Sequence, residues 1–116
     1  MRSTSAVVEN HLKCFGEGDL DGILSDYAPD AVLITPDGIL RGREAIRSLF
    51  VAMLAEFGQL GTTFSLQRHY VEGEHAFIVW SAETPNNLYE LGTDTFFVRG
   101  GRIAVQSFAS KTKRKA

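Results

Sequence analysis

The sequence predicts a single α+β domain, in which three helices of the N-terminal half cover one face of a curved antiparallel sheet. Two patterns carry this prediction. Apolar residues recur at helical spacing up to Gly58, and β-rich runs separated by short turns follow Gly61. A chain of 116 residues has the common size of one domain, so residues 1–116 are expected to form one unit.

Three helices are expected in the first half. Apolar residues recur every three or four positions from Thr4 to Phe15, and the glycines that follow end that helix. Asp19 is a suitable N-cap for a second helix, whose apolar face runs from Leu20 to Tyr27. A third helix with a wide apolar face is expected between Gly42 and Gly58.

Strands fill the remaining sequence. A short hairpin is expected around the turn-forming Pro36-Asp37-Gly38, between residues 31–35 and 39–40. Longer strands are expected at residues 62–71, 75–84, 88–98 and 103–110. Because only short turns separate these four segments, neighbouring strands should pair as an antiparallel meander.

Both faces of this meander carry bulky side chains. Phe77 and Val79 alternate with Ile78 and Trp80, so neither face of that strand is polar. A sheet with one wet face does not show this pattern. We therefore expect the helices to cover one face and a second copy of the chain to cover the other, as a homodimer.

Charge and composition exclude several classes of protein. The net charge is −2, and a basic tail at about residues 111–116 holds four of the positive charges, so the remainder is acidic. A nucleic-acid groove is not expected on an acidic body. No leader and no apolar run of membrane-spanning length is visible, which predicts a cytoplasmic protein without a membrane partner. The one cysteine, Cys14, excludes an internal disulfide.

Several short strings, in order and at matching spacing, resemble the SnoaL-like family of the nuclear-transport-factor-2-like superfamily. They are Gly18-Asp19-Leu20-Asp21, Tyr27-Ala28-Pro29-Asp30-Ala31-Val32, Pro36-Asp37-Gly38, Gly42-Arg43-Glu44-Ala45-Ile46 and Gly100-Gly101-Arg102-Ile103. The resemblance implies a cone-like curved sheet with a ligand pocket between its concave face and the helices. It does not imply one chemistry, because this fold hosts both enzymes and binding modules.

The resemblance also implies positions for the pocket residues. It places on the concave face Ala76, Ile78, Trp80, Ala82, Leu91, Thr93, Thr95, Gln106, Phe108 and Ser110. Compared with ketosteroid isomerase, His11 falls at the oxyanion-hole tyrosine, Thr35 at the general base and Thr93 at the protonated aspartate. Threonine cannot shuttle the proton that an aspartate can, so isomerase chemistry of that kind is disfavoured. No Arg-x-Asp occurs, which disfavours limonene epoxide hydrolase chemistry as well.

Two candidate catalytic residues stand out. His11 lies on the apolar side of the first helix, where it serves either as an acid–base group or as a hydrogen-bonded core residue. Asp94 lies on the face opposite Thr93 by strict alternation, and only a β-bulge near Gly92 would turn it into the pocket. The candidate ligand-binding residues are Tyr27, Phe50, Trp80, Thr93, Gln106 and Phe108.

A purely structural role remains an alternative for the binding residues too. Trp80 is either a ligand-stacking wall or plain core, and Gln106 is either a ligand partner or an amide bonded to the next strand. No metal-ligand spacing or phosphate loop is present, so neither a metal nor a cofactor is expected. The functional hypothesis is a cofactor-free isomerase, cyclase or hydratase acting on a small, largely apolar molecule. The alternative is a non-catalytic, dimeric ligand-binding or protein-interaction module.

Overall fold

The computed structural model describes residues 1–116 and begins with two capped helices. Helix α1 spans Thr4–Glu17, and the Ser3 hydroxyl caps it by accepting a hydrogen bond from the backbone N–H of Ala6. Gly18, with a φ of 69°, ends α1 in the left-handed region that glycine adopts without strain. Helix α2 spans Leu20–Ser25, and Asp19 caps it as expected by accepting from the N–H of Gly22.

A hairpin and the longest helix follow. Strand β1 spans Tyr27–Thr35 and β2 spans Gly38–Arg41, with the predicted turn between them. Helix α3 spans Arg43–Phe57 and buries Ile46 and Phe50. The prediction that Tyr27 ends the second helix is wrong. The helix stops at Ser25, and the N–H of Ile103 donates to the Asp26 carbonyl, which starts a strand pairing instead.

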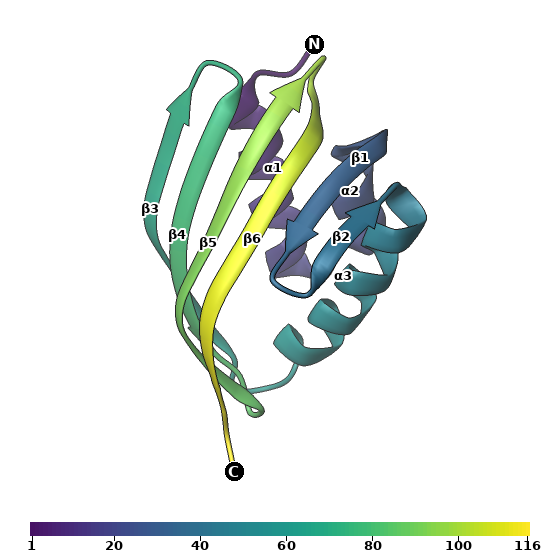
Figure 1. Ribbon diagram of the computed structural model, residues 1–116. Helices are drawn as coiled ribbons and strands as arrows, with labels where there is room; N and C mark the ends of the chain where they lie inside the picture. The colour runs from purple at the N-terminus through teal and green to yellow at the C-terminus, as the bar shows by residue number, and fades with distance from the viewer.

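The sheet has six strands in the order β2-β1-β6-β5-β4-β3 (Figure 1). The meander consists of β3 (Thr63–Glu72), β4 (His75–Glu83), β5 (Asn87–Arg99) and β6 (Arg102–Arg114). These bounds confirm the four expected strands, except that β6 continues through the segment expected to be a basic tail. There, Lys111 and Lys113 lie 3.6 and 3.9 Å from carboxylate oxygens of Glu90. All pairings are antiparallel except that of β1 with β6, which is parallel.

A β-bulge interrupts β5 and decides which of its side chains face inward. Trp80 lies opposite Gly92, and Ala82 lies opposite Tyr89, so three steps along β5 match two along β4. The register with β6 shifts at the same place. The extra residue in β5 reverses the alternation of inward and outward side chains. Beyond the bulge, Asp94 and Phe96 therefore point inward and are buried.

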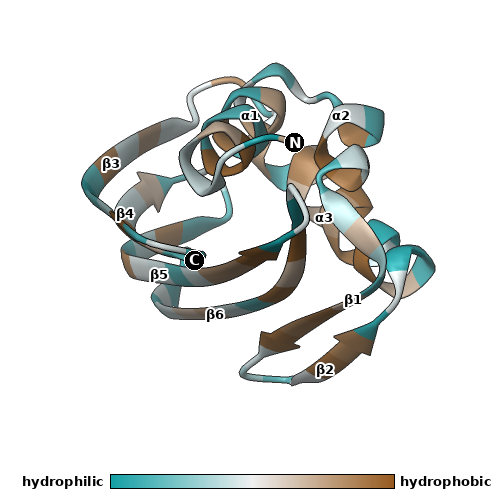
Figure 2. Cartoon of the chain, turned by 90° about the horizontal axis from the view of Figure 1, so that it is seen from above, coloured by the Kyte–Doolittle hydropathy of each residue, from teal (hydrophilic) through white to brown (hydrophobic).

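The helices lie on the inner face of the bent sheet (Figure 2). Apolar side chains from α1, α3 and the sheet form one cluster, whose largest fully buried members include Tyr27 and Phe96. This arrangement confirms the expected α+β architecture with a curved sheet. No helix is long and apolar enough to cross a bilayer.

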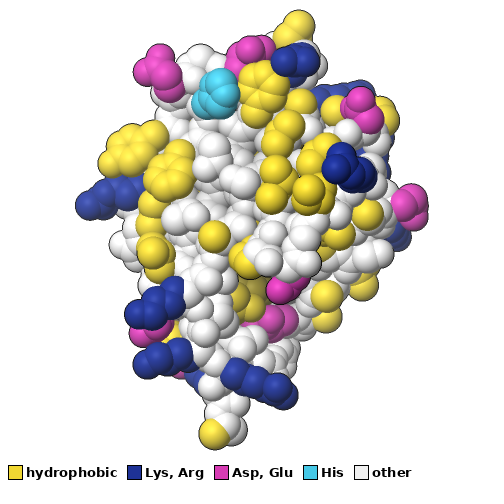
Figure 3. Space-filling model, in the orientation of Figure 1, with side chains coloured by type: hydrophobic (Ala, Val, Ile, Leu, Met, Phe, Trp, Pro, Cys, Tyr) yellow, Lys and Arg dark blue, Asp and Glu magenta, His cyan; other side chains and the backbone are white.

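The opposite face of the sheet is uncovered and partly apolar (Figure 3). Strand register places on it the exposed side chains of Ile34, Tyr70, Phe77, Leu91 and Val105. Serine and threonine lie between these apolar groups, for example Thr95 between Phe77 and Ser107. The face is therefore mixed rather than continuously apolar.

Candidate functional site

A cavity lies between helices α1 and α3 and the inner face of the sheet. Its empty volume is about 550 Å³, which includes the mouth that opens to solvent. The lining residues are His11, Leu12, Phe15, Leu33, Leu49, Phe50, Met53, Phe57, Phe64, Ile78, Trp80, Asp94, Phe96, Gln106 and Phe108. Twelve of these fifteen residues are hydrophobic, and the other three are His11, Asp94 and Gln106.

Trp80 forms a flat part of this wall, because its indole lies directly on the backbone of β5. A Cβ added at Gly92 would come within 2.2 Å of the indole ring, so no larger residue fits below it. The rings of Phe64 and Phe108 lie nearly parallel to the indole, at 28° and 10°, with centroids 5.5 and 6.2 Å away. Such a surface suits stacking of a planar ligand.

A chain of hydrogen bonds fixes the polar end of the cavity. The indole N–H of Trp80 donates to one oxygen of Asp94 at 2.8 Å, and the amide Nε2 of Gln106 donates to the other, also at 2.8 Å. Behind them, the hydroxyl of Tyr27 donates to Oε1 of Gln106. Both carboxylate oxygens of Asp94 are therefore held in place from two neighbouring strands.

Burial changes the acidity of Asp94. Desolvation raises the pKa of this carboxyl to about 6, and the hydrogen bonds from Trp80 and Gln106 limit the rise because they stabilise the ionised form. Near neutral pH the side chain is mostly ionised, yet the protonated form remains populated. Asp94 can therefore either accept or donate a proton in the cavity.

His11 occupies another part of the wall and is also buried. Its ring makes edge-on contacts with Tyr27, Phe50 and Phe96, with centroids 5.5–5.6 Å away. Burial lowers the pKa of His11 to about 4, against the opposing effect of the Asp26 carboxylate. The imidazole is therefore neutral at physiological pH, and its Nδ1 is buried without a hydrogen-bond partner.

The structure brings most of the predicted site residues together. His11, Asp94, Phe50, Trp80, Gln106 and Phe108 all line the cavity. Tyr27 does not line it but lies behind Gln106 as a support. Their functional roles remain predictions.

The predicted inward position of Thr93 is wrong, and so are those of Leu91 and Thr95. These side chains lie on the outer face, because the bulge in β5 reverses the alternation that the prediction assumed. The same bulge turns Asp94 into the cavity. In the prediction from sequence, the inward position of Asp94 depended on such a bulge near Gly92. Gly92, within a strand, was the sequence signal for the irregularity.

A second polar cluster closes one end of the domain. The carboxylate of Glu56, in the last turn of α3, accepts hydrogen bonds from Thr84, Asn87 and Tyr89. These three residues lie at the hairpin between β4 and β5. The cluster fixes the end of α3 beside the hairpin, next to the aromatic wall of the cavity, where Phe57 contacts Trp80 and Tyr89.

Three helices over the inner face of a bent sheet, with a cavity between them, form the fold that nuclear-transport-factor-2-like proteins have. Residues 8–106 match the SnoaL-like domain family, and the chain belongs to that family. No curated protein matches the chain in sequence.

Solved structures confirm the fold. A nuclear-transport-factor-2-like protein of unknown function from Mesorhizobium loti is 24% identical, with a TM-score of 0.75 over 93% of this chain and 90% of that one. A provisionally assigned polyketide cyclase from Sinorhizobium meliloti is 21% identical, with a TM-score of 0.74 over 89% and 93%. A provisionally assigned ketosteroid isomerase from Kribbella flavida is 12% identical, with a TM-score of 0.77 over 97% and 81%. At these identities the likeness shows the fold alone.

Proposed function

We propose that this protein is a cofactor-free enzyme of the isomerase, cyclase or hydratase type, which acts on a small, largely apolar organic molecule by acid–base chemistry. One observation carries the proposal. Only two titratable side chains, His11 and Asp94, lie in the wall of an otherwise mainly aromatic cavity, and burial favours the neutral form of each. Displaced pKa values in a cleft are typical of acid–base sites.

The two residues have complementary roles in this proposal. Neutral His11 accepts a proton from the ligand at Nε2. In the fraction of molecules in which Asp94 is protonated, its carboxyl group donates to a ligand oxygen, while Trp80 and Gln106 hold it in position. General acid–base catalysis of this kind contributes roughly 10²–10⁴-fold in rate. The surrounding rings bind the apolar part of the ligand and exclude water.

The assignments of two structural neighbours support the same reaction class. They name a polyketide cyclase and a ketosteroid isomerase, and both polyketides and ketosteroids contain carbonyl groups. A carbonyl compound with an apolar, planar body is therefore the first substrate class to test against the flat surface of Trp80.

The binding part of the proposal is tested by filling the cavity. Leu49 and Val51 lie two positions apart on α3, but only Leu49 lines the cavity, whereas Val51 is half exposed. Mass spectrometry of the purified protein should detect a copurifying organic molecule in the wild type and in V51W, and lose it in L49W. Equal retention in L49W and V51W would show that any bound molecule lies elsewhere.

The catalytic part is tested once a substrate is found. H11Q and D94N should each lower kcat by roughly 10²–10⁴-fold while the fold is kept. A loss of less than about threefold in either variant would remove that residue from the mechanism.

A second candidate function is a non-catalytic, dimeric binding or interaction module. The engagement of both Asp94 oxygens by neighbouring side chains favours it, because neither oxygen is left without a partner. In this proposal the apolar side chains of the outer sheet face, such as Phe77 and Val105, pack against a second copy. Light scattering at micromolar concentration should then give twice the monomer mass for the wild type. The F77E variant should give the mass of a monomer. A monomeric wild type would contradict the dimer.

A further inference from the structure

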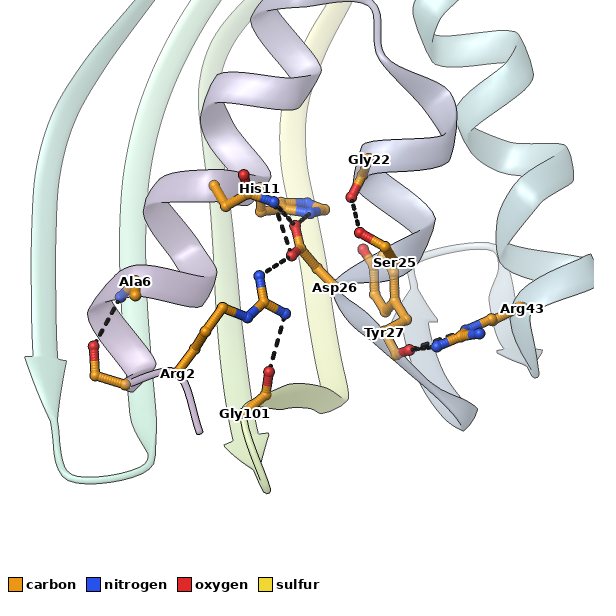
Figure 4. A network of polar contacts seen from close by, with 11 residues as sticks. Arg2, Ala6, His11, Gly22, Ser25, Asp26, Tyr27, Arg43 and Gly101 are labelled. Atoms are coloured by element: carbon orange, nitrogen blue, oxygen red, sulfur yellow. Dashed lines mark hydrogen bonds and ion pairs between the residues drawn. The ribbon is translucent and has the colours of Figure 1, made fainter.

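Asp26 is a fully buried carboxylate outside the cavity, at the junction of α2 and β1 (Figure 4). Arg2 contacts it through Nη1 at 2.6 Å, and the amide of Asn10 donates to both of its oxygens at 2.9 and 3.1 Å. Burial of an ion requires such partners, because a buried, unpaired charge is strongly destabilising. Arg2 is the only cation that contacts this carboxylate.

His11 faces the same carboxylate but does not reach it. Its Nδ1 lies 3.9 Å from Oδ2 of Asp26, too far for a hydrogen bond, and has no other partner. Around the ring, α3 contributes Phe50, β1 contributes Tyr27 and β5 contributes Phe96, none of which is charged at neutral pH.

The ionisable groups that can act on His11 are therefore few. Asp26 faces Nδ1, Arg2 stands beyond Asp26, and Asp94 lines the same cavity. Because Asp26 is the nearest acceptor, its charge favours the imidazole tautomer that carries the proton on Nδ1, which leaves the lone pair on Nε2.

We propose that Arg2 and His11 compete for the Asp26 carboxylate, so that the N-terminal arm of residues 1–3 sets the base strength of His11 from outside the cavity. The arm is the part of the chain before α1. Arg2 and Asp26 are positioning residues in this scheme, since neither lines the cavity. The catalytic meaning of the competition rests on the proposed function, whereas the competition itself is a property of the resting protein.

Arg2 holds the arm through contacts at two places. Besides Asp26, Arg2 binds the carbonyl oxygen of Gly101 at 3.0 Å, and its side chain is 40% exposed. With Arg2 in place, the guanidinium offsets the charge of Asp26, and burial keeps His11 neutral. Arg2 contacts Oδ1, whereas Nδ1 of His11 faces Oδ2, so the two cations compete for one negative charge rather than for one oxygen. Without Arg2, the charge of the carboxylate is no longer offset, and it stabilises the imidazolium form, which raises the pKa of His11.

The experiment is a nuclear magnetic resonance titration of the imidazole nitrogens between pH 3.5 and 8 in the whole chain. The signals of His11 are identified by their loss in H11Q, and the exposed His69 and His75 serve as internal references. R2Q should raise the pKa of His11 by roughly one pH unit or more, as expected for an uncompensated carboxylate within about 4 Å. R2K, which keeps the charge, should stay near the wild type.

Two controls separate this contact from a general charge effect. R102Q removes a positive charge from the nearby hairpin without touching Asp26, and should leave the titration of His11 unchanged. R2Q combined with D26N should cancel the rise; if this double variant does not fold, the comparison of R2Q with R2K and R102Q still decides. An unchanged pKa of His11 in R2Q, or an equal rise in R102Q, would overturn the proposal. Neither outcome depends on turnover, so the proposed enzymatic function stands or fails separately.

Discussion

The two buried groups of the cavity should oppose each other in the pH dependence of stability. Asp94 keeps its proton in the native state up to about pH 6, whereas an unfolded aspartate releases it near 3.8. Between these values the native state holds more protons, so the free energy of unfolding falls as pH rises. The stability that Asp94 contributes is therefore complete below about pH 3.8 and lost once the pH passes 6.

His11 acts in the opposite direction over nearly the same range. The unfolded imidazole binds a proton below about 6.5, whereas the native one does so only near pH 4. The unfolded state therefore holds more protons, and the free energy of unfolding rises with pH between 4 and 6.5. Each shift is slightly more than two pH units, which corresponds to about 3 kcal/mol, so the two contributions nearly cancel in the wild type.

Single substitutions should expose each contribution. From pH 4 to 7, the free energy of unfolding of D94N relative to the wild type should rise by about 3 kcal/mol, and that of H11Q should fall by about as much. The double variant should show neither trend. Urea unfolding followed by circular dichroism at half-unit pH steps measures these differences, and constant offsets from packing do not affect the trends. If both differences vary by less than about 1 kcal/mol across the range, the opposing linkage is refuted.

Three further predictions follow from the aromatic side chains of the cavity and from the polar cluster around Glu56. The fluorescence of Trp80, the only tryptophan, should titrate with a midpoint of about 6 and lose this transition in D94N; a transition that persists in D94N would contradict the assignment to Asp94. G92A should cost about 1–3 kcal/mol in urea unfolding and shift the tryptophan emission, because the indole must leave its place on β5; unchanged values for both would contradict the clash. E56Q should lower the free energy of unfolding by about 1–2 kcal/mol, because the three hydrogen bonds to the Glu56 carboxylate weaken. The control E9Q on α1 should change the free energy of unfolding by less than about 0.5 kcal/mol. Equal effects of E56Q and E9Q would show that the polar cluster around Glu56 does not stabilise the fold.

Local patterns predict most of the fold correctly. Helical spacing, the Asp19 cap and the glycines around the helices depend on residues a few positions apart, and so does the alternation in β4. The inward positions of Ile78, Trp80, Gln106 and Phe108 followed from the resemblance and are confirmed.

The errors arise where distant segments decide the outcome. Which side chains of β5 point inward beyond Tyr89 depends on the bulge beside Gly92. At this place Trp80 from β4 lies on the backbone of β5. The parallel pairing of β1 with β6 joins segments about seventy residues apart, which no local periodicity shows. The pairing of Arg2 with Asp26 likewise has no sequence signal, because the two residues meet only after α1 and α2 have packed.

The order of the strands has a consequence for how the protein is made. Of the six strands, β6 emerges last from the ribosome, yet it lies between β1 and β5 and joins the N-terminal hairpin to strands β3–β5. Until β6 emerges, no strand connects the hairpin to β3–β5, and the cavity lacks Gln106 and Phe108. Because the closing contacts are so distant in sequence, folding during synthesis should stall in an open intermediate. A nascent chain arrested before residue 102 should therefore remain sensitive to protease, and protection should appear only when β6 has been released.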